Sequence, residues 1–172
     1  MRASTACLLA LSAGLAWAPV PALAQGEVVR LKRNPAAIIL EAARVNAGAD
    51  TVYVSGQLPS PLDPAMAMTA VDSWEDLGDT QAQTMSVLGK IEEILATQGF
   101  TMADVVKINV FLTADPRTGT MDFAGMNTAF RAYFGTAEQA ETTARSTFQV
   151  AGLVGPHYLI EIDATAARAP AQ

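Results

Sequence analysis

The sequence has very little of the residue types that metal binding, disulfides and covalent catalysis need. Its 172 residues include one cysteine, Cys7, and one histidine, His157. Cys7 lies in an apolar N-terminal run, so the rest of the chain has no thiol for a disulfide, a zinc site or a nucleophile. It also has no glycine-rich phosphate loop. We therefore expect no metal, no cofactor and a fold that rests on its hydrophobic core.

Positive charge is also scarce, since 11 Lys and Arg residues face 17 Asp and Glu residues and the net charge is −6. Nucleic-acid affinity comes largely from neutralising phosphates with Lys and Arg. We therefore expect no nucleic-acid partner and no ribonuclease activity. No stretch after the N-terminus approaches the roughly 20 apolar residues that a membrane helix needs, so we expect no membrane association of the mature form.

The first residues have the pattern of a secretory signal peptide. A charged start at Arg2 precedes an apolar run over residues 6–18 and the small-residue site Ala22-Leu23-Ala24. The apolar run is too short to span a bilayer. We predict a signal peptide over residues 1–24, a single domain over residues 25–172, and a secreted or periplasmic location.

Hydrophobic periodicity predicts two helices. Over residues 79–98, apolar side chains recur at spacings of three and four, with Asp79 or Thr80 as a cap and Gly99 after the end. The second helix, over residues 121–134, begins after a Thr120 cap and carries a stripe of large apolar residues that we assign to the core. The stripe consists of Phe123, Met126, Phe130 and Phe134.

The remaining periodic segments predict strands, at residues 51–55, at residues 105–113 and twice within residues 143–163. Residues 36–46 have helical propensity, but the turn residues that follow favour a strand that forms a hairpin with residues 51–55. Ignoring a short segment at residues 26–34, the order is β-β-α-β-α-β-β. We predict an α+β fold with both helices on one face of a sheet, whose other face a second copy covers.

Residues 143–163 carry the two charges that a plain core strand does not explain. We predict a hairpin here that brings Arg145 and Glu161 to one wall. A buried guanidinium costs several kcal/mol unless it meets an anion. That anion is either an internal carboxylate, Glu161 or Asp163, or the carboxylate of a ligand. We expect only one of the two acidic residues to join Arg145, and the residues alone leave the choice open.

Several short motifs, in order and at nearly the same spacing, resemble the RidA (YjgF/YER057c/UK114) family. The resemblance covers residues 36–167. It implies a chorismate-mutase-like fold and a homotrimer, with a central barrel of sheets and three clefts between subunits. The motifs are Val52 to Pro59, Gln83-Thr84, Asp104 to Lys107, Val110 to Leu112, Asp122-Phe123, Asn127, Ala144 to Ser146 and Ile160 to Asp163.

The same resemblance implies hydrolysis of small reactive 2-imino or enamine acids, such as 2-aminoacrylate, to the 2-keto acid and ammonia. Arg145 would hold the substrate carboxylate in a bidentate fork. Glu161 would position the attacking water. The implied substrate-binding residues are Ser55, Gly56, Asn127, Ser146 and Thr147.

The chain departs from the family pattern in two places that bear on the site. Many imine-hydrolysing members have a tyrosine where this chain has residues 40–42, and a cysteine where it has Thr147, which can still hydrogen-bond a water. An alternative function is non-catalytic binding of small carboxylates at the same cleft. In other interpretations Glu161 is only the counter-ion of Arg145, Ser55 only ends a strand and Asn127 lies on a helix surface.

Overall fold

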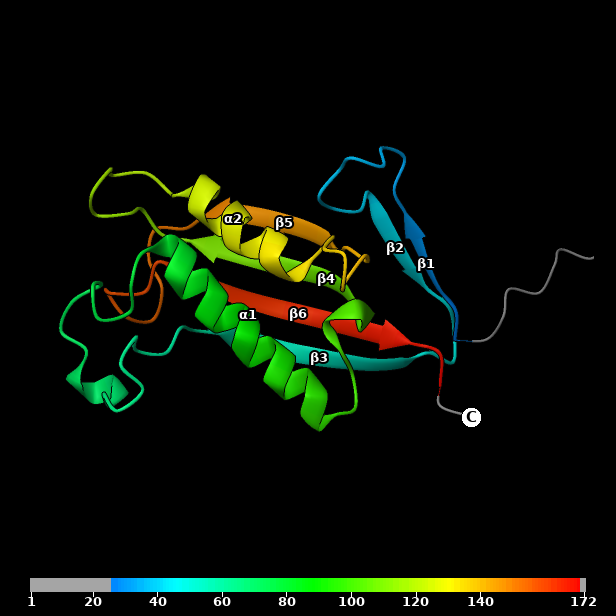
Figure 1. Ribbon diagram of the computed structural model, residues 1–172, viewed down its shortest axis with the longest axis horizontal. Helices are drawn as coiled ribbons and strands as arrows, with labels where there is room; N and C mark the ends of the chain where they lie inside the picture. Colours follow the sequence, from blue (N-terminus) through cyan, green and yellow to red (C-terminus); the bar gives the residue numbers. More distant parts are fainter. Residues whose placement is uncertain (1–25, 171–172) are drawn as a thin grey trace, which may run out of the picture.

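A four-stranded sheet forms the body of the protein, of which the computed structural model describes residues 26–170. The strand order is β3-β6-β4-β5, with bounds Asp50–Gln57 for β3, Ile160–Arg168 for β6, Val105–Leu112 for β4 and Ala144–Gln149 for β5. β6 runs antiparallel to β3 and β4, whereas β5 runs parallel to β4. Because a parallel pair needs a crossover, α2 connects β4 to β5 across the sheet (Figure 1).

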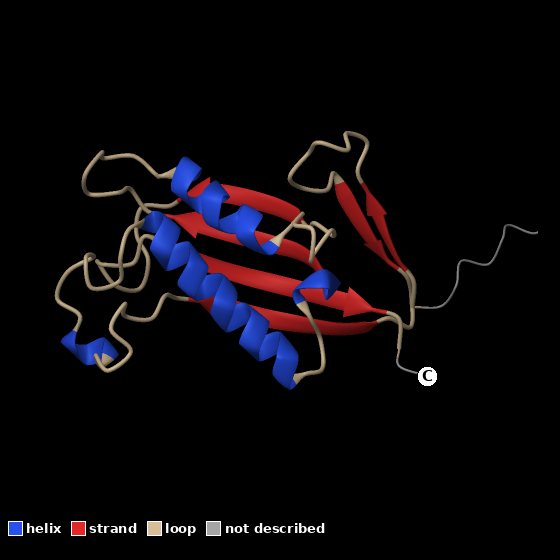
Figure 2. Cartoon of the chain, in the orientation of Figure 1, coloured by secondary structure: helices blue, strands red, loops and turns tan. Residues whose placement is uncertain are grey.

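Both helices lie on one face of this sheet, which confirms the predicted α+β architecture (Figure 2). α1 spans Thr80–Thr97, and the Asp79 side chain caps it by accepting a hydrogen bond from the Ala82 N–H at 2.9 Å. α2 spans Phe123–Tyr133 and is capped by Asp122, not by Thr120 as we predicted. The Asp122 carboxylate accepts from the Gly125 N–H at 2.8 Å, so the helix begins two residues later than expected.

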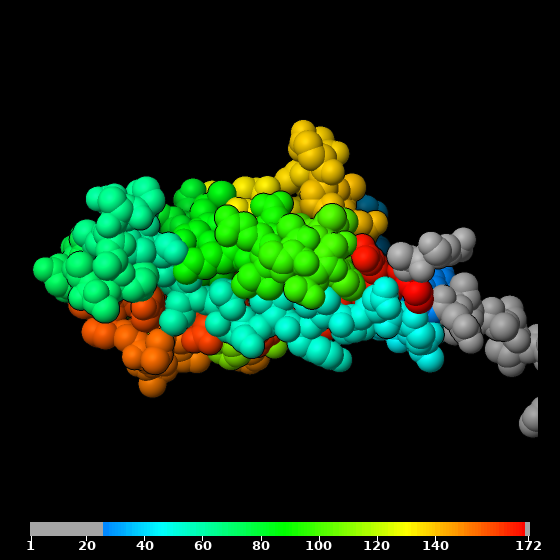
Figure 3. Space-filling model, turned by 90° about the horizontal axis from the view of Figure 1, so that it is seen from below, coloured from blue at the N-terminus to red at the C-terminus, as the bar shows by residue number. Residues whose placement is uncertain are grey.

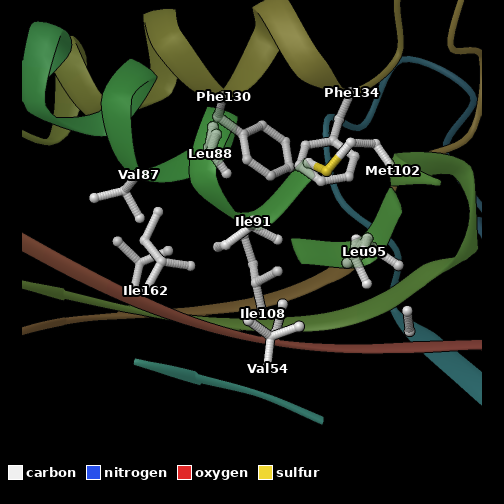
Figure 4. Close-up of a cluster of buried hydrophobic side chains, with 14 of the residues drawn as sticks. Val54, Val87, Leu88, Ile91, Leu95, Met102, Ile108, Phe130, Phe134 and Ile162 are labelled. Carbon is white, nitrogen blue, oxygen red and sulfur yellow. The ribbon is translucent and has the colours of Figure 1, made fainter. Parts of the chain in front are cut away.

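The core lies between the helices and the sheet. Figure 4 shows side chains of the two helices, among them Ile91 and Phe130, lying over Val54, Ile108 and Ile162 of the strands. Ile91, Leu95 and Ile108 are at most 1% exposed, and the Phe130 and Phe134 rings stack at 4.7 Å between centroids. Burial of large apolar side chains supplies the main stabilising term in a chain whose described part holds no cysteine.

A two-stranded ribbon stands apart from the main sheet and corrects one prediction. β1 (Val28–Leu31) pairs with β2 (Ala42–Val45), so residues 36–46 do not form a hairpin with β3. The segment before β2 instead reaches β5, where the Leu40 N–H donates to the Thr143 carbonyl at 3.0 Å. Arg30 of β1 also donates to the Ala103 carbonyl at 2.7 Å. The ribbon is therefore held by the Arg30 side chain and by the bridge at Leu40, and not by pairing of β2 with β3.

The long connection from β3 to α1 packs at one end of the molecule, together with the loop that follows β5 (Figure 3). It includes a short 3-10 turn, η1 (Met68–Ala70), and a second such turn, η2 (Met102–Asp104), precedes β4. The Arg117 guanidinium lies 5.1 Å from the Trp74 ring centroid and also holds the buried Asp115 carboxylate. This cation–π contact attaches the connection to the loop after β4.

Candidate functional site

Arg145 lies on the helix side of β5, the strand at one edge of the sheet. Its Cα pairs with that of Ile108 on β4, a core residue, so its side chain faces α2. The guanidinium carbon is 4.4 Å from the Phe130 ring centroid and 5.7 Å from the Phe123 ring centroid. One guanidinium nitrogen is 3.6 Å from the Met126 sulfur. The helical stripe that we assigned to the core thus also forms the seat of Arg145.

This guanidinium has no carboxylate partner among residues 26–170, where Arg30, Arg33 and Arg117 make the ion pairs. Burial, with a smaller contribution from the like charge of Arg131, lowers the pKa of Arg145 to about 10. The aromatic rings offset part of the desolvation cost, by about 0.5–2 kcal/mol each in such contacts. Arg145 therefore stays charged at neutral pH, half-buried, with its hydrogen-bond donors available to an anion.

Glu161 lies on the opposite, open face of the sheet. Its Cα pairs with that of Phe111 on β4, and its carboxylate lies over Gly56. A Cβ on Gly56 would collide with the Glu161 carboxylate as it lies here, so a larger residue would displace the end of this side chain. The pairing of β3 with β6 shifts register between Val54 and Gln57, which places Gly56 in a β-bulge under the acid.

The predicted hairpin of Arg145 and Glu161 is therefore wrong. β4 lies between β5 and β6. β5 runs parallel to β4 along one of its edges, and the chain then returns as β6, antiparallel to β4 along the other edge. The expectation that only one acid joins Arg145 is also wrong. Glu161 and Asp163 are two residues apart on one strand and share the open face, and Asp163 accepts from the Asn109 amide at 2.9 Å. Neither acid pairs with Arg145.

The predicted substrate-binding residues divide between the two faces in the same way. Thr147 pairs with core residue Val110, so it is on the Arg145 side, and Asn127 follows Met126 on α2. The Asn127 side-chain oxygen is buried and has no hydrogen-bond partner in the described part of the chain. Ser55 is exposed at the bulge beside Gly56. The Ser146 hydroxyl is on the open face too, where it accepts from the Lys107 ammonium at 2.6 Å.

Within residues 26–170, no group of three or more His, Cys, Asp or Glu side chains is placed to hold a metal ion. No helix in the same residues is long and apolar enough to cross a membrane. The signal peptide predicted for residues 1–24 lies outside the described residues.

Comparison with known proteins identifies the family of this chain. The family model described as Endoribonuclease L-PSP matches residues 41–168. The chain belongs to this family, which is the YjgF/RidA family. The match confirms the resemblance seen in the motifs. Among curated relatives, a RutC family protein of Pyrococcus horikoshii is 31% identical over 140 residues, covering 81% of this chain and 96% of the relative.

Solved structures of RidA-family proteins share this fold. A Rid family protein of Yersinia pestis is similar with a TM-score of 0.56 and 27% identity, covering 75% of this chain and 86% of that one. The Escherichia coli YjgF protein is similar with a TM-score of 0.53 and 30% identity, covering 69% and 81% of the two chains. The RidA-type architecture of two helices on a mixed sheet is thereby confirmed.

The sequence analysis did not identify the surroundings of Arg145 as part of the site. Phe123 is 43% exposed, which is unusual for a residue of a core stripe, and it lies beside the guanidinium. Periodicity on α2 indicated which residues face the sheet, but not that an edge-strand arginine occupies the space beneath them. In this RidA-family chain the seat is aromatic.

Proposed function

We propose that this protein hydrolyses small 2-imino or enamine acids to the corresponding 2-keto acid and ammonia. The observation that carries the proposal is Arg145, a half-buried guanidinium without an anionic partner in residues 26–170, seated between aromatic rings of α2. Such a group offers a ready site for the carboxylate that every 2-imino acid carries. Membership of the RidA family supports this substrate class.

Arg145 binds the substrate carboxylate through a bidentate pair of hydrogen bonds. The planar guanidinium presents two parallel N–H groups that match a carboxylate, which the point charge of lysine does not do. Phe130 and Phe123 restrict the rotation of the guanidinium, so less entropy is lost when the substrate binds. The Asn127 side-chain oxygen, buried without a partner in the described chain, is an acceptor for the imine N–H.

Glu161 reaches this substrate from a neighbouring copy of the chain. Arg145 and Glu161 lie on opposite faces of one sheet, so a single chain cannot bring them together. The open face leaves Tyr53 81% and Phe148 49% exposed, and large exposed aromatic groups of this kind favour coverage by a protein surface. A cyclic trimer that sets the β5 edge of one copy against the open face of the next forms three such sites.

The reaction needs one water and no external reactant. Glu161 accepts a proton from the water as its oxygen bonds to the carbon of the protonated imine, which gives a neutral tetrahedral carbinolamine. That proton then passes to the nitrogen, the carbon–nitrogen bond breaks, and ammonia leaves as the hydroxyl proton returns to Glu161 and the keto group forms. An enamine first takes a proton from water on its terminal carbon to become the protonated imine. The imine carbon is already electrophilic, so holding both reactants in line supplies much of the rate.

The first test measures keto-acid release from freshly generated 2-aminoacrylate. Wild type is expected to speed release over the uncatalysed rate, and Arg145→Ala is expected to lose this effect. Arg44→Gln is the matched control, because Arg44 is an exposed arginine of β2 that belongs to neither half of the site. Equal rates for wild type and Arg145→Ala would show the proposal to be wrong.

A second test asks whether the site joins two copies. Arg145→Gln and Glu161→Gln chains, each inactive alone, are unfolded together and refolded as a mixture. If a site takes one residue from each of two neighbours in a ring, random assembly restores about one quarter of the wild-type sites. If both residues act within one chain, no activity returns.

Carboxylate binding without turnover is the second candidate function. It is favoured by one observation: within the described part of one chain, the contacts of the Arg145 guanidinium are apolar rings and a thioether, with no acid or base beside it. In that case 2-oxobutanoate raises the melting temperature through Arg145, as any ligand of the native state does, while no imine is consumed. Turnover in the first test excludes this candidate.

A further inference from the structure

A pocket of about 200 Å³ lies at the C-terminal end of α2, beside the loop that joins β1 to β2. Its walls are Pro35, Ile38 and Phe134, with Thr142 at the start of the segment that leads into β5. Lys32 and Arg131 also line it, one from the loop and one from the last turn of α2. The pocket thus combines an apolar floor with two cations that come from separate elements.

The two cations have no ion-pair partner in residues 26–170. Two acidic residues close in sequence to the pocket are engaged elsewhere, since Glu41 pairs with Arg33 and Glu141 with Arg30. No carboxylate is among the pocket's lining residues. The helix dipole accounts for one cation at the end of α2. It does not account for Lys32, which the loop brings to the same pocket.

The pocket is separate from the seat of Arg145 but close to it. Phe130 lies between them, since Arg145 stacks on one ring of the Phe130–Phe134 pair and the other ring lines the pocket. The loop is held in place because the Thr142 hydroxyl donates to the Ile38 carbonyl at 2.5 Å. The charge of Arg131 also contributes to the lowered pKa of Arg145. Arg131 and Arg145 therefore influence each other electrostatically, and Lys32 joins Arg131 at the pocket, in a chain of net charge −6.

We propose that this pocket is a second anion-binding site, which takes a small organic carboxylate with a short apolar chain. Lys32 and Arg131 bind the carboxylate, and the apolar part of the ligand lies against Pro35, Ile38 and Phe134. Charge-assisted hydrogen bonds hold such a group more strongly than neutral ones. Because an anion here reduces the positive potential at Arg145, the two sites bind their anions with mutual antagonism, as linkage requires in both directions.

The proposal does not rest on imine hydrolysis, and its test uses butyrate as the probe. Butyrate is titrated into the full chain while backbone amide signals are followed by NMR. We expect saturable shifts at Gly135 and Thr142, both of which line the pocket. Butyramide has the same chain without the charge and is expected to bind about tenfold more weakly or not at all. Equal affinity for the two probes overturns the proposal, as does the absence of saturable shifts at both residues.

Variants then assign the site. The double variant Lys32→Gln/Arg131→Gln is expected to weaken butyrate binding at Gly135 and Thr142 about tenfold or more, through loss of two charged donors. Arg145→Gln is expected to change it no more than about threefold, even where imine turnover is lost. Arg33→Gln is the control for loss of a nearby cation, because Arg33 neighbours Lys32 but does not line the pocket. The proposal is overturned if Arg145→Gln abolishes butyrate binding at Gly135 and Thr142 while the double variant retains it.

Discussion

Charged groups on the two faces of the sheet differ in whether their own chain supplies polar partners. On the open face two pairs of polar groups satisfy each other: Asp163 accepts from Asn109, and Ser146 accepts from Lys107. On the helix side Arg145 faces aromatic rings and a thioether and has no carboxylate partner in residues 26–170. A polar group that its own chain satisfies contributes to stability. A half-buried charge that its chain leaves unpaired costs stability and is therefore the better candidate for function.

Replacing the unpaired charge gives the largest expected effect. We expect Arg145→Met to lower kcat/KM for 2-aminoacrylate by about 100-fold or more, since the charge-assisted fork to the carboxylate is lost. The free energy of unfolding is expected to stay equal or rise, because methionine suits the aromatic seat and removes a desolvated charge. Enzyme kinetics and urea unfolding check the two parts. A large loss of stability would mean that Arg145 is a structural residue.

A substitution at Gly56 tests the role of the Glu161 carboxylate on the open face. In Gly56→Ala the new Cβ displaces the Glu161 carboxylate, which is the far end of a flexible side chain and is able to move. We expect kcat to fall about tenfold with KM little changed, because the water loses its positioning group while the carboxylate clamp remains. Steady-state kinetics give the two parameters separately. A rise in KM alone would place Glu161 in binding and not in water positioning.

The pH dependence of binding tests the charge state of Arg145. Folding disfavours its charged form and lowers the pKa to about 10. A carboxylate binds only the charged form, so the affinity for 2-oxobutanoate is expected to be constant below pH 9 and about fourfold weaker half a unit above the pKa. The unfolded arginine keeps its proton there, so the stability cost of the Arg145 charge begins to decrease as pH rises above 10. Calorimetric titration measures the affinity, with circular dichroism to confirm the fold.

The smallest effect is expected on the satisfied face, away from Gly56. Asn109→Ala removes the donor to Asp163 and leaves that carboxylate to water. We expect the free energy of unfolding to fall by about 1 kcal/mol, the typical value of one such hydrogen bond. Imine turnover is expected to change less than about twofold, because Asn109 touches neither Arg145 nor Glu161. A tenfold loss of activity would contradict the division between the two faces.

Much of the fold was predictable from local patterns. The helix from Asp79 is defined by its cap, its apolar spacing and Gly99, whose φ of +72° favours glycine. The strand order along the chain and the one-sided helix layer also followed from periodicity. The pairing of β2 was mispredicted, because the turn after it suggested a local hairpin, whereas contacts with residues distant in sequence, at Arg30 and Leu40, decided its position.

The sequence by itself determined the family, the α+β class and the identity of Arg145 and Glu161 as the residues to explain. Only the tertiary structure decided that they lie on opposite faces. Alternation along a strand assigns a face only relative to neighbouring strands, and the insertion of β4 between β5 and β6 sets that relation. The physical reason is that strand pairing depends on contacts distant in sequence, which local propensity does not encode. Arg145 is thus left without a counter-ion among residues 26–170.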